Sequence, residues 1–449
     1  MAAGEKTTGE STAGARTVFG PMKPDGYIPR LIDSRLQRML GLFGAVEVRG
    51  TKWCGKSWSS YAVARSVAHL DDSDMRALAE ADPSLALHGE RPHVIDEWQE
   101  VPAVWDAVRR SVDSSGGSKG LYILTGSSTP EKDKVSHSGA GRIARLDMRT
   151  MTLFERGLAQ GGVSLAGLFE GRFESGAYQG PGLGELADAI CVGGWPALLG
   201  ASPDDAAEVV EQYLDALFDV SIPAKGGTGQ VARRLASALA RNVASSATLE
   251  TLAADARMDG DGGTTLARTT VRRYLDLFND LYFIEELPGW DAPVRSRSRL
   301  RTKPKRYFTD PSMAASLLGM GPARLLEDAQ TFGLLFESLC VHDLRVLASL
   351  LPGYHADSVR YYGDSDGLEV DVVLELKDGR WAAIEVKLGE AKVAKGIDNL
   401  LRLGRKVASN PASRNPEPEF MMVLTAVSPI WRRDKESGVY VVPLSALEP

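Results

Sequence analysis

Eight residues at positions 50–57, Gly-Thr-Lys-Trp-Cys-Gly-Lys-Ser, constrain the fold of this chain more than any other stretch. They match the Walker A pattern G-x-x-x-x-G-K-[ST], in which glycines allow a tight loop whose N–H groups face phosphates. The apolar segment 45–48 predicts a strand before the loop, and residues 57–68 predict a helix after it. We therefore predict a P-loop that binds a nucleotide, with an empty structural loop as the alternative.

The loop assigns residues to both the nucleotide and its metal. Lys56 is the predicted phosphate-binding and catalytic lysine, and the Ser57 hydroxyl is a predicted ligand of Mg²⁺. The predicted cofactors are ATP and Mg²⁺. The residues that we expect to line the nucleotide are Gly50, Thr51, Lys52, Trp53, Cys54, Gly55, Lys56, Ser57 and Trp58.

Length and composition limit the remaining possibilities. A chain of 449 residues predicts several domains, and its three widely spaced cysteines predict neither a disulfide framework nor a zinc site. The formal charge of −7 means that any nucleic-acid contact needs a local basic patch. No apolar run approaches the roughly 20 residues of a bilayer span, and the polar segment 1–20 predicts disorder rather than a secretory signal. We expect a cytoplasmic protein without a membrane partner.

Two apolar segments end in polar side chains that suit ATP hydrolysis. One predicted strand ends in Asp96 and Glu97, which we assign as the metal-linked carboxylate and the catalytic base. The strand predicted over 121–128 carries Ser127 and Ser128 at its end, and Ser127 is our candidate for sensing the γ-phosphate. In an open parallel sheet such strand ends share the edge that faces the ligand. The alternatives are a capped strand end and a helix N-cap.

Arg142 follows a glycine-rich stretch and precedes a predicted strand at 143–148. In this position its guanidinium would reach the phosphates bound by a neighbouring subunit, as an arginine finger. The alternative is a surface ion pair within the same chain. The first interpretation predicts a homo-oligomer.

The order of these motifs resembles a large prokaryotic group of AAA-type ATPases that carry a C-terminal domain of unknown function. The resemblance covers most of the chain after residue 21 and implies an ATPase domain over 21–160, built on a parallel sheet. The departure is Lys52-Trp53-Cys54, which is bulkier than the small residues usual inside the loop. The segments that carry the resemblance are Arg30, 50–57, 94–99, 124–128, Gly141-Arg142 and 193–196.

The middle of the chain predicts a glycine-rich linker and helical region over 161–229, followed by a winged helix over 230–310. Three helical patterns precede an alternating strand there, and 269–281 takes the recognition position. Seven of the twelve residues in 295–306 are basic, which suits phosphate contacts on DNA. The alternatives are a winged helix that contacts protein and a basic loop that pairs with an acidic surface in an oligomer. The other predicted DNA contacts are Arg268, Arg272 and Arg273.

The last 139 residues, 311–449, predict an α/β domain that resembles the restriction-endonuclease-like nuclease core. In that resemblance Asp371 and Glu385 bind Mg²⁺, Lys387 helps to activate water, and Glu337 assists from a helix at 331–350. Phosphodiester hydrolysis needs a metal between clustered carboxylates and a cation near the attacked phosphate. The alternative is a degenerate nuclease fold that is kept for binding.

Strand register tests this nuclease interpretation. A two-residue turn at Asp378-Gly379 would place Asp371 opposite Val386, so that Asp371 would point away from Glu385. The catalytic interpretation therefore requires a three-residue turn over 377–379 or a bulge near Asp371.

Taken together, the sequence predicts an α/β chain with a parallel-sheet ATPase domain, a helical middle and an α/β C-terminal domain. The first functional hypothesis is an ATPase that couples its nucleotide state to DNA binding or cleavage by the C-terminal region. The alternative is an ATP-dependent regulatory or partner-binding switch whose nuclease-like domain is inactive.

Overall fold

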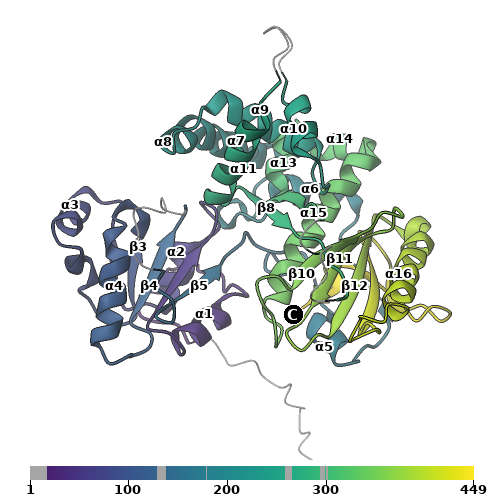
Figure 1. Ribbon diagram of the computed structural model, residues 1–449, viewed down its shortest axis with the longest axis horizontal. Helices are drawn as coiled ribbons and strands as arrows, with labels where there is room; N and C mark the ends of the chain where they lie inside the picture. Colours follow the sequence, from purple (N-terminus) through teal and green to yellow (C-terminus); the bar gives the residue numbers. More distant parts are fainter. Residues whose placement is uncertain (1–17, 129–137, 178, 258–264, 294–298, 300–301) are drawn as a thin grey trace, which may run out of the picture. The chain divides into compact units, whose positions relative to one another are not determined.

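The computed structural model describes residues 18–128, 138–177, 179–257, 265–293, 299 and 302–449 (Figure 1). Most of the segment predicted to be disordered, 1–20, lies outside these ranges. The chain divides into two compact units. The first unit contains residues 1–49, 56–126 and 130–147, and the second contains residues 50–55, 127–129 and 148–449.

The first unit is built on a five-stranded parallel sheet with the strand order β2-β3-β4-β1-β5 (Figure 1). Strands β3 and β4 are buried along their whole length, as expected for central strands that are covered on both faces. The strands are β1 (Ala45–Arg49), β2 (Ser66–His69), β3 (His93–Asp96), β4 (Tyr122–Gly126) and β5 (Ile143–Asp147). The helices are α1 (Asp33–Leu40), α2 (Lys56–Val63), α3 (Ser73–Ala81) and α4 (Ala103–Ser114).

The helix predicted over 57–68 is too long. In the structure α2 ends at Val63, and the last residues of the predicted helix form β2 instead. Val67 pairs with Val94 and Ala68 with Ile95 in a parallel ladder with β3. This tertiary pairing overrides the local helical pattern, which is a weak constraint on its own.

The second unit begins with a helical region. Three of its helices, α9 (Gly229–Arg241), α10 (Leu249–Asp255) and α11 (Arg268–Asp280), precede the antiparallel pair β8 (Ile284–Leu287) and β9 (Lys305–Phe308). This is the element order that the sequence predicted, and the winged-helix interpretation itself stays a prediction. The other helices are α6 (Leu183–Val192), α7 (Pro203–Ala216), α8 (Ile222–Ala224), α13 (Pro311–Leu317) and α14 (Pro322–Glu327).

The connection between β8 and β9 packs against the C-terminal α/β region. The rings of Trp290 and Trp381 lie 4.9 Å apart between centroids. The backbone N–H of Trp290 donates to the Tyr361 carbonyl at 2.6 Å. The connection between β8 and β9 is therefore tied to the C-terminal sheet.

The C-terminal region combines helix α15 (Ala329–Ala348) with a mixed seven-stranded sheet of order β10-β11-β12-β13-β15-β14-β7. Helix α16 (Val393–Ala408) packs on β12 and β13 through an apolar core that includes Leu400 and Val423 (Figure 1). The strands are β7 (Gly176–Ala177), β10 (Val359–Gly363), β11 (Glu369–Glu375), β12 (Trp381–Lys387), β13 (Phe420–Thr425), β14 (Ile430–Arg433) and β15 (Tyr440–Pro443).

The glycine-rich segment predicted as a linker is partly built into this C-terminal region. Strand β7 pairs with β14, and β6 (Val163–Ser164) pairs with β16 (Leu447–Glu448). A Cβ atom at Gly176 would overlap the ring of Trp431, so glycine is needed here for close packing. Glycine content alone therefore gave the wrong prediction for this segment.

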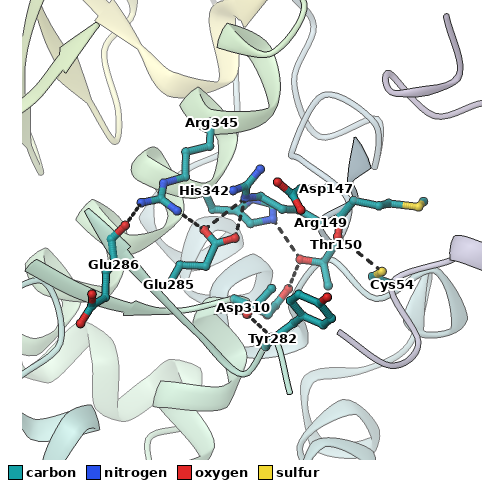
Figure 2. Close-up of polar contacts among 12 residues, drawn as sticks. Cys54, Asp147, Arg149, Thr150, Tyr282, Glu285, Glu286, Asp310, His342 and Arg345 are labelled. Atoms are coloured by element: carbon teal, nitrogen blue, oxygen red, sulfur yellow. Dashed lines mark hydrogen bonds and ion pairs between the residues drawn. The ribbon is translucent and has the colours of Figure 1, made fainter. Parts of the chain in front are cut away.

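A buried polar network joins the segment after β5 to β8 and α15 (Figure 2). The Arg149 guanidinium lies 2.8 Å from the Glu285 carboxylate, and Arg345 forms a second ion pair with the same carboxylate. The Thr150 hydroxyl donates to Asp310 at 2.6 Å and lies 3.0 Å from Nε2 of His342. Burial alone would raise the pKa of Glu285, but Arg149 and Arg345 together lower this pKa to about 2.

Replacing Glu285 by Gln removes the charge that two guanidinium groups share. We expect a loss of about 3–5 kcal/mol in the free energy of unfolding at neutral pH, because two buried cations lose their partner. The folded-state pKa of Glu285 lies below the ordinary value of 4.5, so this stabilisation is present above that pH. It disappears as the pH falls towards 2, and denaturant unfolding at neutral and acidic pH measures the change.

The matched control is Glu286→Gln on the same strand. Glu286 lies 3.0 Å from Arg306, and its side chain is 39% exposed. We expect this pair to contribute below about 1 kcal/mol, because solvent screens it. Equal losses in the two variants would contradict the importance of the Arg149–Glu285–Arg345 network.

Candidate functional site

The loop between β1 and α2 has the backbone geometry of a tight turn. Gly50, Trp53 and Gly55 all have positive φ angles, of 156°, 67° and 102°. A Cβ atom at Gly50 would overlap the carbonyl oxygen of Met148, so only glycine fits there. Of these three residues, only Trp53 carries a side chain. A positive φ angle at such a residue strains the backbone, and such strain concentrates at functional loops.

The bulky loop residues contact protein. The Thr51 hydroxyl lies 2.7 Å from the hydroxyl of Tyr213, a half-buried residue of α7. Cys54 donates its S–H to the Met148 carbonyl at 3.6 Å (Figure 2). The Trp53 ring lies 6.5 Å from that of Tyr213, while 56% of the Trp53 side chain remains exposed. Trp53 and Cys54 thus have protein neighbours that small residues would not reach, whereas Lys52 is exposed. Sequence reasoning missed Tyr213, since a tyrosine on an amphipathic helix has no distinguishing signal.

Asp96, at the end of β3, is surrounded by hydroxyl donors. The Ser57 hydroxyl donates to its Oδ1 at 3.0 Å, and the hydroxyls of Thr125 and Tyr61 also donate to this carboxylate. Asp96 is buried, with 7% of its surface exposed. Burial raises the pKa of the Tyr61 phenol, and its hydrogen bond to Asp96 adds to that shift. The structure thus brings the predicted Mg²⁺ residues Ser57 and Asp96 together.

Lys56 and Glu97 lie next to these residues in the chain. Lys56 is buried at the first position of α2, with 5% exposure. Glu97 has a left-handed backbone with φ of 53°, and its N–H donates to the Thr125 hydroxyl at 3.2 Å. The Gln99 amide donates to the Glu97 carboxylate. Ser127 directly follows β4 and is buried, whereas Ser128 is half-buried.

The set Ser57 and Asp96 fits a nucleotide-bound Mg²⁺. This ion keeps several waters and is usually held by one or two protein oxygens together with substrate phosphates, so it does not need a protein cage. Two protein oxygens already in contact, beside a buried lysine, meet that requirement.

Arg142 lies at the opposite edge of the parallel sheet from Asp96. It precedes β5, whereas Asp96 ends β3, so the length of a strand, roughly 15 Å, separates the two edges. Its guanidinium donates to Asp113 at 2.7 Å, and 48% of its side chain is exposed. Within one chain, Arg142 therefore forms a surface ion pair, which is the alternative to an arginine finger.

The C-terminal residues Asp371 and Glu385 share one face of the sheet. Val372 pairs with Ile384, and the turn is closed by the Leu376 N–H, which donates to the Arg380 carbonyl at 2.9 Å. This gives the three-residue turn over 377–379 that the catalytic interpretation requires. The Asp371 carboxylate accepts the Val386 N–H at 2.8 Å.

One lysine, Lys387, lies between Asp371 and Glu385, and a second, Lys305, lies between Asp371 and Glu337. Lys387 lies 3.6 Å from Asp371 and forms an ion pair with Glu385, which also accepts from Asn399 at 3.1 Å. Lys305 lies 2.9 Å from Glu337 and 3.6 Å from Asp371. The carboxylate–lysine cluster is formed by Lys305, Glu337, Glu369, Asp371, Glu385 and Lys387.

The pKa values of two carboxyl groups in this cluster differ from those expected of carboxylates that bind a shared metal ion. Burial, together with the nearby Asp371 charge, raises the pKa of Glu337 to about 7 and that of Glu385 to about 8. Tyr307 donates its hydroxyl to Glu337 at 2.8 Å. Sequence reasoning missed Lys305 and Tyr307 as site residues, although residues two apart on a strand share a face.

Of the described cations in the basic segment 295–306, Lys303 is exposed, whereas Arg299 and Arg306 are half-buried and Lys305 is buried. Residues 295–298 and 300–301 lie outside the described ranges. Arg299 binds the Glu375 carboxylate with two hydrogen bonds of 2.7 and 2.9 Å, and Arg306 pairs with Glu286. Lys305 is 1% exposed, so the expectation that it contacts DNA is wrong.

Helix α11 exposes arginines, as the sequence predicted for the helix in the recognition position of a winged helix. Arg272 and Arg273 are exposed, and Arg273 also donates to the Gly226 carbonyl. Arg268 pairs with Glu250 at 2.8 Å, with 70% of its side chain exposed.

Three family models match successive segments of the chain. A model of an AAA domain matches residues 43–156. The N-terminal region thus matches an AAA domain, which supports a P-loop ATPase of the AAA type. A domain of unknown function (DUF8612) matches residues 183–324, and a second one (DUF4143) matches residues 332–447. The resemblance to AAA-type ATPases with a C-terminal domain of unknown function is confirmed at this level, whereas the winged-helix and nuclease interpretations stay predictions.

Similar proteins extend over most of the chain. Two uncharacterised proteins, from Mycobacterium bovis and Mycobacterium tuberculosis, are each 25% identical over 367 residues, which is 79% of this chain and 72% of theirs. Among solved structures, the Walker-type ATPase PABY2304 of Pyrococcus abyssi aligns with 11% identity and a TM-score of 0.43, covering 66% of this chain and 97% of its own. The replication initiator DnaA bound to AMPPCP and single-stranded DNA aligns with 14% identity and a TM-score of 0.28, covering 58% and 92%. Neither structural likeness is close enough to carry an argument. Across the described ranges, no helix has the length and apolar character needed to cross a membrane.

Proposed function

We propose that this chain binds ATP at the loop Gly50–Ser57 and hydrolyses it. The observation that carries the proposal is the contact between Ser57 and Asp96, 3.0 Å apart, at the sheet edge where Lys56 is buried and Glu97 follows. These groups are the parts that P-loop hydrolysis needs, namely a cation for the phosphates, two metal-binding oxygens and a carboxylate for water.

Each residue has a defined role in this proposal. Lys56 binds the β- and γ-phosphates, while Ser57 and Asp96 hold the metal side of the site. Bound Mg²⁺ would neutralise the charge on the phosphates. Glu97, turned by its left-handed backbone and held by Gln99, orients the attacking water and accepts its proton. Ser127 is the candidate hydroxyl near the γ-phosphate.

Two substitutions separate binding from hydrolysis. We expect Lys56→Ala to abolish both ATP binding and turnover, because it removes the cation that the phosphates need. We expect Glu97→Gln to retain ATP binding and to lower turnover by about 10²-fold or more, because only the base is removed. Fluorescent-nucleotide binding and phosphate release measure the two properties, and unchanged turnover in Lys56→Ala would refute the assignment.

The same proposal extends to oligomerisation through Arg142. Since Arg142 lies at the amino edge of its own sheet, its guanidinium would act only on a nucleotide held by a second copy. Its half-exposed side chain and its pairing with a surface carboxylate leave it available for such a contact.

We expect turnover per subunit to rise with protein concentration, and Arg142→Ala to lower turnover at high concentration by about 10³-fold. Arg110→Ala, at an exposed position of α4, is the matched control. Turnover that is independent of concentration in a verified monomer would count against the trans arginine.

The output of ATP hydrolysis is the second part of the proposal. Thr51 and Cys54 contact Tyr213 and the Met148 carbonyl, so the loop is joined directly to the helical region. We propose that this region binds DNA through the exposed face of α11 in a nucleotide-dependent way. The alternative is a regulatory or partner-binding switch that uses the same coupling without DNA.

A charge reversal on α11 distinguishes these outputs. We expect Arg272→Glu to weaken DNA binding about equally across sequences and to reduce the salt slope by about one, as the loss of a phosphate contact does. Arg110→Glu in the ATPase domain is the control for net charge. Fluorescence anisotropy with labelled single-stranded and duplex DNA measures both. Wild-type protein that binds neither DNA at low salt would refute the DNA proposal and favour the switch.

A further inference from the structure

Lys305 is the buried centre of the carboxylate–lysine cluster. Its Nζ lies 2.7 Å from Glu369, 2.9 Å from Glu337 and 3.6 Å from Asp371, and its side chain is 1% exposed. The carboxylates come from α15 and β11, whereas the ammonium comes from β9. A buried ammonium is costly unless carboxylates surround it, so these groups form one interdependent unit.

Both oxygens of Asp371 are used by protein donors. Oδ1 faces Lys305, while Oδ2 faces Lys387 at 3.6 Å and accepts the Val386 N–H at 2.8 Å. Nuclease chemistry would need this carboxylate as the ligand shared between the metal and the neighbouring acids. In this structure the ammonium groups of Lys305 and Lys387 lie beside Asp371, where the metal would have to bind.

A divalent cation such as Mg²⁺ needs several oxygen ligands that converge on one point. The point on which Glu337, Glu369 and Asp371 converge is the Nζ of Lys305. In the parts of the chain that the structure describes, no three His, Cys, Asp or Glu side chains are arranged to hold a metal. The residues of this cluster therefore do not fit Mg²⁺.

We propose that Lys305 is the resident cation of the cluster and stands where a nuclease would hold a divalent metal. The C-terminal region is then a metal-free module, in which Lys305 joins β9 of the helical region to α15 and β11. Removing the ammonium would uncover a latent cation site between Glu337 and Asp371. This inference concerns the contact of β9 with the C-terminal region and does not depend on ATP hydrolysis.

Mn²⁺ is the probe that tests the proposal, because its free and bound forms are distinguished by electron paramagnetic resonance. The full-length protein carries Asp96→Asn throughout, so that the nucleotide site does not contribute. We expect no Mn²⁺ binding that depends on Asp371 in this background. We expect Lys305→Met to gain a stoichiometric Mn²⁺ site, and the added change Asp371→Asn to abolish it. Lys305→Arg, which keeps the charge, should bind no more than the parent.

Two results would overturn the proposal. The first is Mn²⁺ binding, or Mg²⁺-dependent DNA cleavage, by a protein with Lys305 intact that is lost on replacing Asp371. The second is a folded Lys305→Met variant, checked by circular dichroism, that gains no site. If Lys305→Met does not fold, the comparison of the parent with its Asp371→Asn variant still decides the question, since Lys305 is present in both.

Discussion

The close approach of Gly50 to the Met148 carbonyl is the constraint on which much of this structure depends. A side chain at Gly50 would overlap that oxygen, and Cys54 donates its S–H to the same carbonyl. The two residues that follow Met148 bind Glu285 and Asp310 inside the second unit. One backbone oxygen therefore links the phosphate loop to a segment that is held by buried ion pairs.

The two acidic sites are distinguished by the charge of their partners. Asp96 accepts hydrogen bonds from the hydroxyls of Ser57, Thr125 and Tyr61, and its Oδ2 lies 3.6 Å from Nδ1 of His69. Asp371 instead faces ammonium groups on both oxygens. Hydroxyl donors leave the charge of a carboxylate in place for a metal, whereas an ammonium competes for the same lone pairs. The same residue type thus suits cation binding in one unit and internal charge pairing in the other.

The sequence predicted the structure best where a short apolar segment forms a fully buried strand. The strand ends at Asp96 and Ser127 follow apolar runs that are buried on both faces, so their position was predictable within a residue or two. The hydroxyls of Thr125 and Tyr61 were not predictable as partners of Asp96, because they meet it only through tertiary folding. The same holds for β2 and β7, whose strand conformation is set by pairing with distant segments.

The basic segment 295–306 shows why charge counted along a sequence overestimates a binding surface. Arg299, Lys305 and Arg306 each meet a carboxylate that is remote in the chain, on β11, α15 or β8. Neutralised cations release no counterions on contact with a phosphate backbone, so they add nothing to the electrostatic part of DNA affinity. The described exposed cations here then include Lys303 and the arginines of α11, one of which already pairs with Glu250. A DNA interface there would be small, and with few phosphate contacts its affinity would depend only weakly on salt.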